Sequence, residues 1–502
     1  MSNIAFLQEL LNSVAETGRQ LLPRSLFRGD PEHGLQALVE ALMSGRGEAS
    51  GVALARQLLR HYQLLDGEMK EVFFRYIAER LKPDTDRVEK AARAYLSEPS
   101  PRRLSVLQQA VESPRQEFFR RLNMAPGATA EIVNMRRDLL PLIHDNPQLA
   151  AIDGDIKHLL DSWFNRGFLV LRRIDWQTPA AILEKIIAYE AVHEISGWDE
   201  LRRRLEPRDR RCFAFFHPSM IDEPLIFVEV ALTEEMSGNV QEVLAKKLDD
   251  DDDDDETPPT TAVFYSISNC QKGLRGISFG NFLIKQVVEE LSRECPTLRT
   301  FVTLSPVPGF GEWLKQEQAK PSSEIFTAED AAALAVVSDR EWHTKKKTAD
   351  AVKPSLMALA GQYFLAEKTS VGMPIDPVAR FHLGNGARLE RVNWLADISP
   401  RGMAQSHGLM VNYLYDLREI ERNHEAFAHS GAVAASRQVR ALLRSKPRAK
   451  TAQPGEAAAA LKPKQLAAPE TEMPKTESSG EKQSKTSSGQ AEQAGAKSRD
   501  EH

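Results

Sequence analysis

The strongest structural signal of this chain lies between Ala262 and Phe310, in AVFYSISNCQKGLRGISFGNFLIKQVVEELSRECPTLRTFVTLSPVPGF. Its first part, Phe264 to Ile267, is short, aromatic and β-branched, which predicts a buried strand. A loop follows, and apolar residues at helical spacing then predict a helix across 282–291. Arg299 to Leu304 restores the strand pattern. The segment therefore predicts a strand, a loop, a helix and a second strand.

The loop from Asn269 to Gly280 is suited to binding an anion. Gly273, Gly276 and Gly280 let the backbone come close to a bulky group. The helix that follows offers unpaired N–H groups and the positive end of its dipole. The loop therefore predicts a pyrophosphate site, either for a nucleotide or for coenzyme A. Cys270 in this loop is interpreted as a small buried filler rather than a reactive thiol.

Composition limits the class of protein. The chain has 502 residues, enough for two or three domains, and its 65 basic and 71 acidic residues give a net charge of −6. This balance gives no indication of nucleic-acid binding. Its three cysteines, Cys212, Cys270 and Cys295, argue against a disulfide framework and lack the close spacing of a zinc site.

The termini and the hydropathy pattern bear on location. The N-terminus has no basic segment followed by an apolar core, as a secretory signal would have. No stretch reaches the roughly 18 apolar residues of a membrane span. Together with the sparse cysteines, this predicts a cytoplasmic protein.

The chain divides into three predicted parts. Residues 1–170 predict a helical domain, since apolar residues recur at helical spacing and strand-like alternation is nearly absent. Residues 171–435 predict a mixed α/β domain, in which Cys212–Phe216 and Leu225–Leu232 form an antiparallel pair. Residues 436–502 are polar and predict a disordered tail. The seven aspartates of 249–255 are interpreted as a solvated loop rather than a metal site.

Ser305 is the first candidate for chemistry. It stands at the carboxyl end of the second predicted strand, where open α/β sheets bind ligands. Pro306 and Pro308 stiffen the turn that presents it. No G-x-S-x-G motif surrounds it, which excludes the usual hydrolase nucleophile. Local sequence alone favours a serine that merely caps a turn.

Several segments, taken together, are similar to malonyl-CoA decarboxylase. The resemblance covers roughly residues 90 to 425 in order and is more specific than the glycine loop alone. It is carried by the following segments: FYSIS (264–268), GLRGISFGNFLIKQVVEEL (273–291), TLSPVPGF (303–310), RRCFAFFHPSM (210–220), EPLIFVEVALT (223–233) and ARFHLGNGARLERVNWLADISPRGMAQSHGLMVNYLY (379–415).

The resemblance implies a fold and a site. The fold is α+β, with an N-terminal helical bundle, an acetyltransferase-like (GNAT-type) catalytic domain and a disordered C-terminal tail. Ser305 matches the family's active-site serine and His382 its active-site histidine. The segment that matches the coenzyme A motif is Arg275, Gly276, Ile277, Ser278, Phe279, Gly280 and Asn281, with Ser266 as a weaker candidate. The family also implies a homo-oligomer, a dimer or tetramer, assembled through the helical domain.

The implied reaction converts malonyl-CoA to acetyl-CoA and CO₂. Loss of CO₂ leaves a thioester enolate, so the site must stabilise negative charge and deliver a proton to the α-carbon. Because the thioester itself takes up the electrons, no metal, redox or covalently bound cofactor is required. Two alternatives stay open: an acyl-CoA-dependent N-acyltransferase, which would need no fixed Ser–His pair, and a non-catalytic acyl-CoA sensor.

Overall fold

The computed structural model describes residues 31–45, 47–245, 257–277, 283–320, 323 and 325–443, together with residues 13 and 17. These residues all belong to one compact unit, Met1–Ser445. The aspartate run 249–255, the loop positions 278–281 and the polar tail from 444 onward lie outside the described residues.

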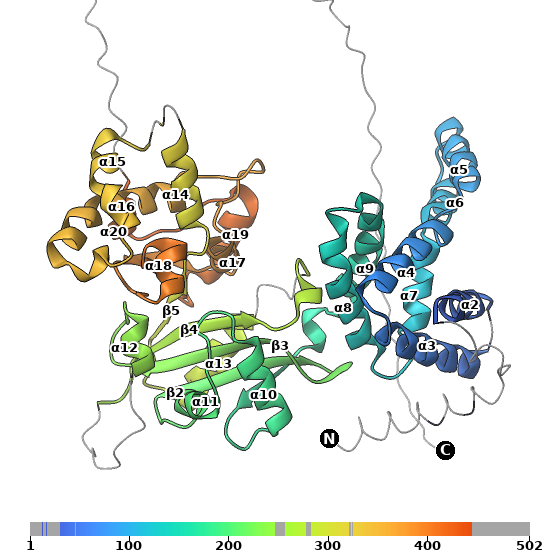
Figure 1. Ribbon diagram of the computed structural model, residues 1–502, viewed down its shortest axis with the longest axis horizontal. Coiled ribbons are helices and arrows are strands. Elements are labelled where there is room, and N and C mark those ends of the chain that lie inside the picture. Colours follow the sequence, from blue (N-terminus) through green and yellow to red (C-terminus); the bar gives the residue numbers. More distant parts are fainter. Residues whose placement is uncertain are drawn as a thin grey trace, which may run out of the picture. The chain divides into compact units, whose positions relative to one another are not determined.

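The N-terminal part is helical, as the sequence predicts (Figure 1). Short polar caps separate its helices: Asp66 accepts a hydrogen bond from the Met69 N–H, and Ser100 and Ser113 cap helices that begin with proline. Phe74, Phe118 and Phe119 lie in the core. The helices are α2 (Pro31–Met43), α3 (Glu48–Gln63), α4 (Gly67–Arg80), α5 (Thr85–Ser97), α6 (Pro101–Val111), α7 (Pro114–Leu122), α8 (Ala128–Leu139) and α9 (Ala150–Trp163).

A mixed sheet of eight strands follows in the order β1-β2-β3-β4-β5-β8-β6, with β7 also paired to β8. The strands are β1 (Val170–Ile174), β2 (Arg210–His217), β3 (Met220–Thr233), β4 (Thr261–Asn269), β5 (Thr300–Thr303), β6 (Ser305–Pro306), β7 (Arg388–Asn393) and β8 (Met410–Leu414). Among these described strands only β4 and β5 are parallel; the other pairs are antiparallel. The predicted antiparallel pair is thus confirmed as β2 and β3.

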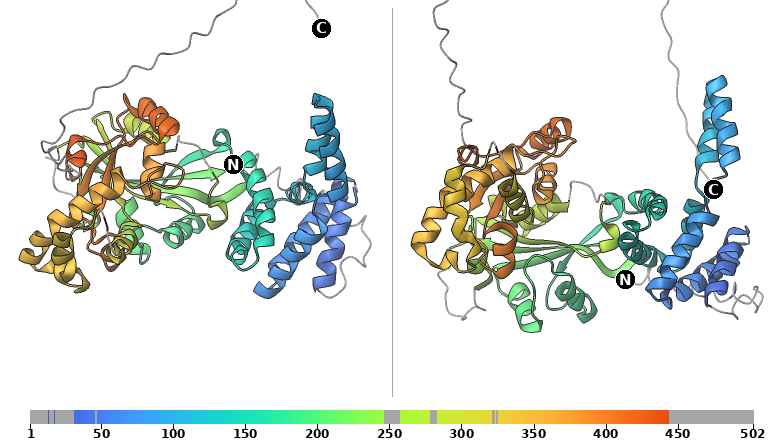
Figure 2. Two further views of the ribbon diagram at one scale, coloured as in Figure 1. Left: turned by 90° about the horizontal axis from the view of Figure 1, so that it is seen from above. Right: turned by 45° about the horizontal axis from the view of Figure 1, so that its top comes forward.

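Helices cover both faces of this sheet, and strand alternation decides which residue meets which helix. In β2, Phe213 and Phe215 belong to the same core as α13 (Leu283–Glu294). Cys212, Ala214 and Phe216 instead pack with α10 (Ala180–Tyr189) and α11 (Trp198–Leu205). The green helices of residues 180–205 lie along one side of the strands in the right-hand view of Figure 2. The expected order, a helical region and then a mixed α/β domain, is confirmed.

The remaining helices come after β3 in the chain. They are α12 (Val240–Ala245), α14 (Phe310–Ala319), α15 (Ala328–Leu334), α16 (Lys346–Leu365), α17 (Pro377–Gly384), α18 (Pro400–Ser406), α19 (Ile420–Ser430) and α20 (Arg437–Arg440). Helix α20 lies beyond the boundary predicted at residue 435. Val439 is fully buried there, and the Ser436 hydroxyl donates to the Glu390 carbonyl oxygen. Helical structure therefore occurs beyond the predicted boundary.

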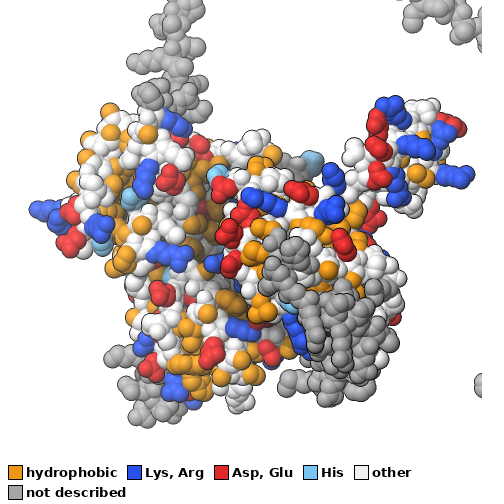
Figure 3. Space-filling model, turned by 45° about the vertical axis from the view of Figure 1, so that its right-hand side comes forward, with side chains coloured by type: hydrophobic (Ala, Val, Ile, Leu, Met, Phe, Trp, Pro, Cys, Tyr) orange, Lys and Arg blue, Asp and Glu red, His pale blue; other side chains and the backbone are white. Residues whose placement is uncertain are grey.

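The surface carries charges of both signs. Basic and acidic side chains are interspersed over the face shown in Figure 3, as expected from the near-balanced composition. In the part of the chain that the structure describes, no helix has the length and apolar character needed to cross a membrane.

Candidate active site

The candidate site lies where two parallel strands separate. Strands β4 and β5 are paired from Thr261–Thr300 to Phe264–Thr303. Beyond this point β4 continues to Asn269, whereas the other branch turns into β6 and pairs with β8. A cavity of about 260 Å³ opens between the branches and is lined by Tyr265 and Ile267 from one side and Leu304 and Ser305 from the other.

Ser305 and His382 meet at this cavity. His382 lies on α17, a short helix that begins at Pro377 and is capped by Asp376, whose carboxylate accepts from the Ala379 N–H. Its Nε2 atom is 3.0 Å from Ser305 Oγ. Both residues are buried, since His382 is 2% exposed and Ser305 is 5% exposed, and both line the cavity. The structure therefore brings the two predicted catalytic residues into hydrogen-bond contact.

The hydrogen bonds around this pair define a tautomer. Ser305 Oγ donates to Thr303 Oγ1 at 2.8 Å, so its proton is not directed at the imidazole. The Ser305–His382 hydrogen bond then requires an N–H on Nε2. Nδ1 is left unprotonated and accepts from the Tyr415 hydroxyl, 2.8 Å away. The ring of His382 also stacks on Tyr413, with centroids 4.5 Å apart.

Burial keeps this imidazole neutral. It lowers the pKa of His382 to about 3, because the charged form loses its hydration. At neutral pH the residue therefore holds a single N–H, as in the tautomer above. It can act as a hydrogen-bond donor and proton relay without carrying a positive charge of its own.

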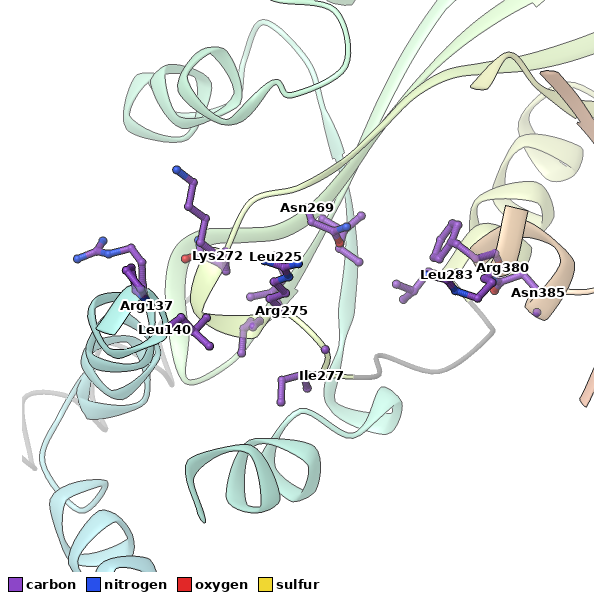
Figure 4. Close-up of a pocket in the computed structure, with 17 residues that line it drawn as sticks. Arg137, Leu140, Leu225, Asn269, Lys272, Arg275, Ile277, Leu283, Arg380 and Asn385 are labelled. Atoms are coloured by element: carbon purple, nitrogen blue, oxygen red, sulfur yellow. The ribbon is translucent and has the colours of Figure 1, made fainter. Parts of the chain in front are cut away.

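A larger cavity of about 780 Å³ adjoins the first, and Figure 4 shows its lining. The two cavities share Asn269 and Phe381. Its size is typical of a ligand site. Among the described residues, four cationic side chains line it and no acidic one does: Arg137 from α8, Lys272 and Arg275 from the glycine loop, and Arg380 from α17. Such a lining favours an elongated anionic ligand.

The predicted coenzyme A loop contributes to this larger cavity in part. Arg275, Gly276 and Ile277 line it. Ser278, Phe279, Gly280 and Asn281 lie outside the described residues. Ser266 lines neither cavity; its hydroxyl donates to the Glu190 carboxylate, with a shortest distance of 2.8 Å. The structure thus separates Ser266 from the other predicted residues.

Sequence reasoning missed several residues of the site. Arg380 stands two positions before His382 in the segment ARFHLG, and this proximity is a signal that could have identified it. Arg137 and Tyr415 carry no such signal, because only the tertiary fold brings them near the loop and the histidine.

Two other predicted features can be compared with the structure. Cys270 is 6% exposed, and burial raises the pKa of its thiol well above the ordinary value, as suits a core residue. Within the described ranges, no group of three or more His, Cys, Asp or Glu side chains is arranged to hold a metal ion.

Known proteins share both the sequence and the fold. The family model for the malonyl-CoA decarboxylase C-terminal domain matches residues 167–453, and that for the N-terminal domain matches residues 81–164. The mitochondrial malonyl-CoA decarboxylase of Anser anser anser is 37% identical over 350 residues, which cover 65% of this chain and 69% of the relative.

Two crystal structures are similar along nearly their whole length. Malonyl-CoA decarboxylase from Rhodopseudomonas palustris has 54% identity and a TM-score of 0.77, and the match covers 82% of this chain and 99% of that one. The protein of the same name from Agrobacterium vitis has 52% identity and a TM-score of 0.76, covering 82% and 100%. With both domain models matched in order, the chain belongs to the malonyl-CoA decarboxylase family of carboxy-lyases.

Proposed function

We propose that this protein decarboxylates malonyl-CoA to acetyl-CoA and CO₂, with Ser305 and His382 in proton transfer. One observation carries the proposal: the buried Ser305–His382 contact of 3.0 Å faces a cavity that shares Asn269 and Phe381 with a larger, cationic one. Family membership suggests malonyl-CoA as the substrate. The larger cavity could bind its coenzyme A portion, and the smaller cavity its malonyl group.

The coenzyme A portion fits the 780 Å³ cavity. Its phosphates would lie near the cationic lining, where Lys272 and Arg275 are exposed and make no ion pair within the described residues. The loop 275–281 would then hold the pyrophosphate, as the sequence predicts. The malonyl group would pass Asn269 and Phe381 into the 260 Å³ cavity and reach Ser305.

The chemistry follows from the hydrogen bonds at the dyad. The carbon–carbon bond to the carboxylate breaks, CO₂ leaves, and the electron pair remains as a thioester enolate. When the substrate binds, the Ser305 hydroxyl would exchange its bond to Thr303 for one to this charge, while the Nε2–H of His382 holds the serine oxygen; a donor aimed at such a charge typically contributes ~3–4 kcal/mol. The α-carbon then takes one proton, which balances the reaction. In one variant Ser305 delivers it, with His382 as the source; in the other Ser305 orients the carboxylate and His382 delivers the proton directly. In both, Nδ1 would take up the Tyr415 hydroxyl proton as Nε2 releases its own, so the imidazole stays neutral, and solvent supplies the proton that is consumed.

The test is to incubate the full-length protein with malonyl-CoA and follow acetyl-CoA by mass spectrometry. We expect one acetyl-CoA and one CO₂ for each malonyl-CoA consumed. Ser305→Ala and His382→Ala should lower kcat by at least ~100-fold while coenzyme A binding is retained. His217→Ala is a matched control, because His217 is also buried but lines neither cavity.

Three other outcomes would contradict the proposal. Full turnover in both site variants would remove Ser305 and His382 from the chemistry. Tight malonyl-CoA binding without product would favour the non-catalytic sensor. Acyl transfer to an added amine would favour the N-acyltransferase.

We also propose that the protein forms a homo-oligomer, a dimer or tetramer, through its helical region. The support is the α5–α6 hairpin, which leaves Leu96, Val106 and Val111 exposed. A cytoplasmic location stays a prediction, and the animal relatives carry mitochondrial names.

A further inference from the structure

Helix α8 of the helical region packs directly on the glycine loop, which contains the short helix η5 (Lys272–Leu274). The closest approach is at Gly273, where a Cβ atom would lie 1.9 Å from the carbonyl oxygen of Val133. Only glycine lets the two backbones come this near. Leu274 is buried in the same core as Val133, so the inner side of the loop rests on the helix.

Arg136 of α8 binds the backbone of the same loop. Its Nη1 donates to the carbonyl oxygens of Gly273 and Arg275, at 2.7 and 2.8 Å. Its Nε donates to Asp153 of α9 at 2.7 Å. The side chain is only 3% exposed, so water does not compete for these bonds. One guanidinium thus joins two helices to the loop.

The other side of the loop faces the larger cavity. Lys272, Arg275 and Gly276 line that cavity, and Arg136 does not. Arg136 therefore holds the loop backbone from behind, while the loop's own side chains are presented toward the ligand space.

We propose that Arg136 is a positioning residue for coenzyme A binding, which makes the helical region part of the determinants of substrate affinity. This inference rests on the function proposed above. Lysine cannot replace the arginine, because an ammonium group lacks the planar fork that reaches both carbonyls and the carboxylate. Without the fork, buried polar groups of the loop lose their partners and the loop is free to move away from the cavity.

The test compares Arg136→Lys and Arg136→Met with Arg115→Lys in the full-length protein. Arg115 is a matched control in the same region: it is 6% exposed, its Nε donates to buried Asp155 at 2.7 Å, and it does not line the cavity. We expect Arg136→Lys to raise the KM for malonyl-CoA and the calorimetric Kd for coenzyme A about tenfold, with kcat nearly unchanged. Arg136→Met should raise both further, and Arg115→Lys should change neither.

A second readout needs no ligand. Hydrogen exchange of the amides of 272–277 should be faster in Arg136→Lys than in Arg115→Lys. Equal exchange, or wild-type KM and Kd in Arg136→Lys, would overturn the proposal. Should both Arg136 variants fail to fold, Asp153→Asn weakens the same anchor and is expected to raise KM in the same direction; an unchanged KM there also overturns it. A wild-type protein that neither binds coenzyme A nor consumes malonyl-CoA would instead refute the proposed function itself.

Discussion

His382 should make the folded protein sensitive to mild acid. In the unfolded chain an imidazole takes up a proton near pH 6.5, whereas in the fold burial lowers the pKa of His382 to about 3. Unfolding therefore binds a proton between these values, and the free energy of unfolding falls as pH falls through this window. Between pH 7.5 and pH 5 this one residue should cost about 2 kcal/mol.

Urea unfolding of the wild type and of His382→Asn at both pH values measures this effect. The variant removes the titrating group and leaves the other buried histidines, such as His193, in place. The wild type should lose about 2 kcal/mol more than the variant on acidification. Equal losses would show that the imidazole of His382 is already charged, or hydrated, in the fold.

Tyr415 should control the proton position on His382. Its hydroxyl is the partner of Nδ1 at 2.8 Å, so Tyr415→Phe leaves that nitrogen buried without a donor. The cost of such a loss is roughly 1–3 kcal/mol, which predicts a fall in kcat of about 5- to 150-fold with little change in KM. Tyr62→Phe is the control, since it removes a buried hydroxyl bonded to Asp138 in the helical region. Unchanged kcat in Tyr415→Phe would mean that Ser305 alone orients the imidazole.

The residues of the site differ in how far sequence could predict them. Ser305 and His382 were identified through the family resemblance, because neither has a local pattern that distinguishes it from an ordinary turn serine or core histidine. Arg136 and Tyr415 were not identified, since their partners lie on other elements of the fold. Ser266 is a weaker candidate because it lies on the strand before the loop, and its hydroxyl is bonded to Glu190 on the side of the sheet away from the cavity that its neighbour Tyr265 lines.

At the scale of elements, strands are predictable where neighbouring residues alone show the strand pattern. The antiparallel partners β2 and β3 have apolar segments on each side of a turn, and both were predicted. A described helix, α20, lies beyond the boundary predicted at residue 435. Helix α20 is four residues long and lies in a polar, alanine-rich stretch, so composition gives no sign that Val439 docks beside β7.

Helix α20 should therefore contribute to stability even though it lies in the predicted tail. A chain that ends after Leu443 should keep the Tm of the full-length protein. A chain that ends after Ala435 loses the buried Val439 side chain, worth ~1.5–3 kcal/mol, and the Ser436 hydrogen bond to Glu390. Differential scanning calorimetry of both truncations makes the comparison. Equal Tm values would show that α20 does not stabilise the fold.

At the scale of the molecule, the order of the helical and mixed α/β parts is predictable from sequence. For the helical region, however, sequence analysis predicts only a role in oligomerisation. The helical region contains no motif that indicates chemistry. Helical periodicity also does not reveal which helical turn will contact a loop more than a hundred residues later in the chain. The structure places Arg137 of α8 in the lining of the larger cavity, and Arg136 is bonded to the glycine loop. The helical region therefore bears on the ligand space as well as on the proposed association.

Association through the α5–α6 hairpin can be tested separately from the chemistry. The two helices pack mainly on each other, and their exposed apolar residues include Leu96 at 77% and Val106 at 50%. Exposed side chains add little to the stability of a single chain, so Leu96→Glu with Val106→Glu should leave the Tm nearly unchanged while sedimentation shows a smaller species. Leu64→Glu is the control, because Leu64 is 82% exposed but lies between α3 and α4. If the wild type is a monomer, association is ruled out. If the double variant sediments as the wild type does, association uses another surface.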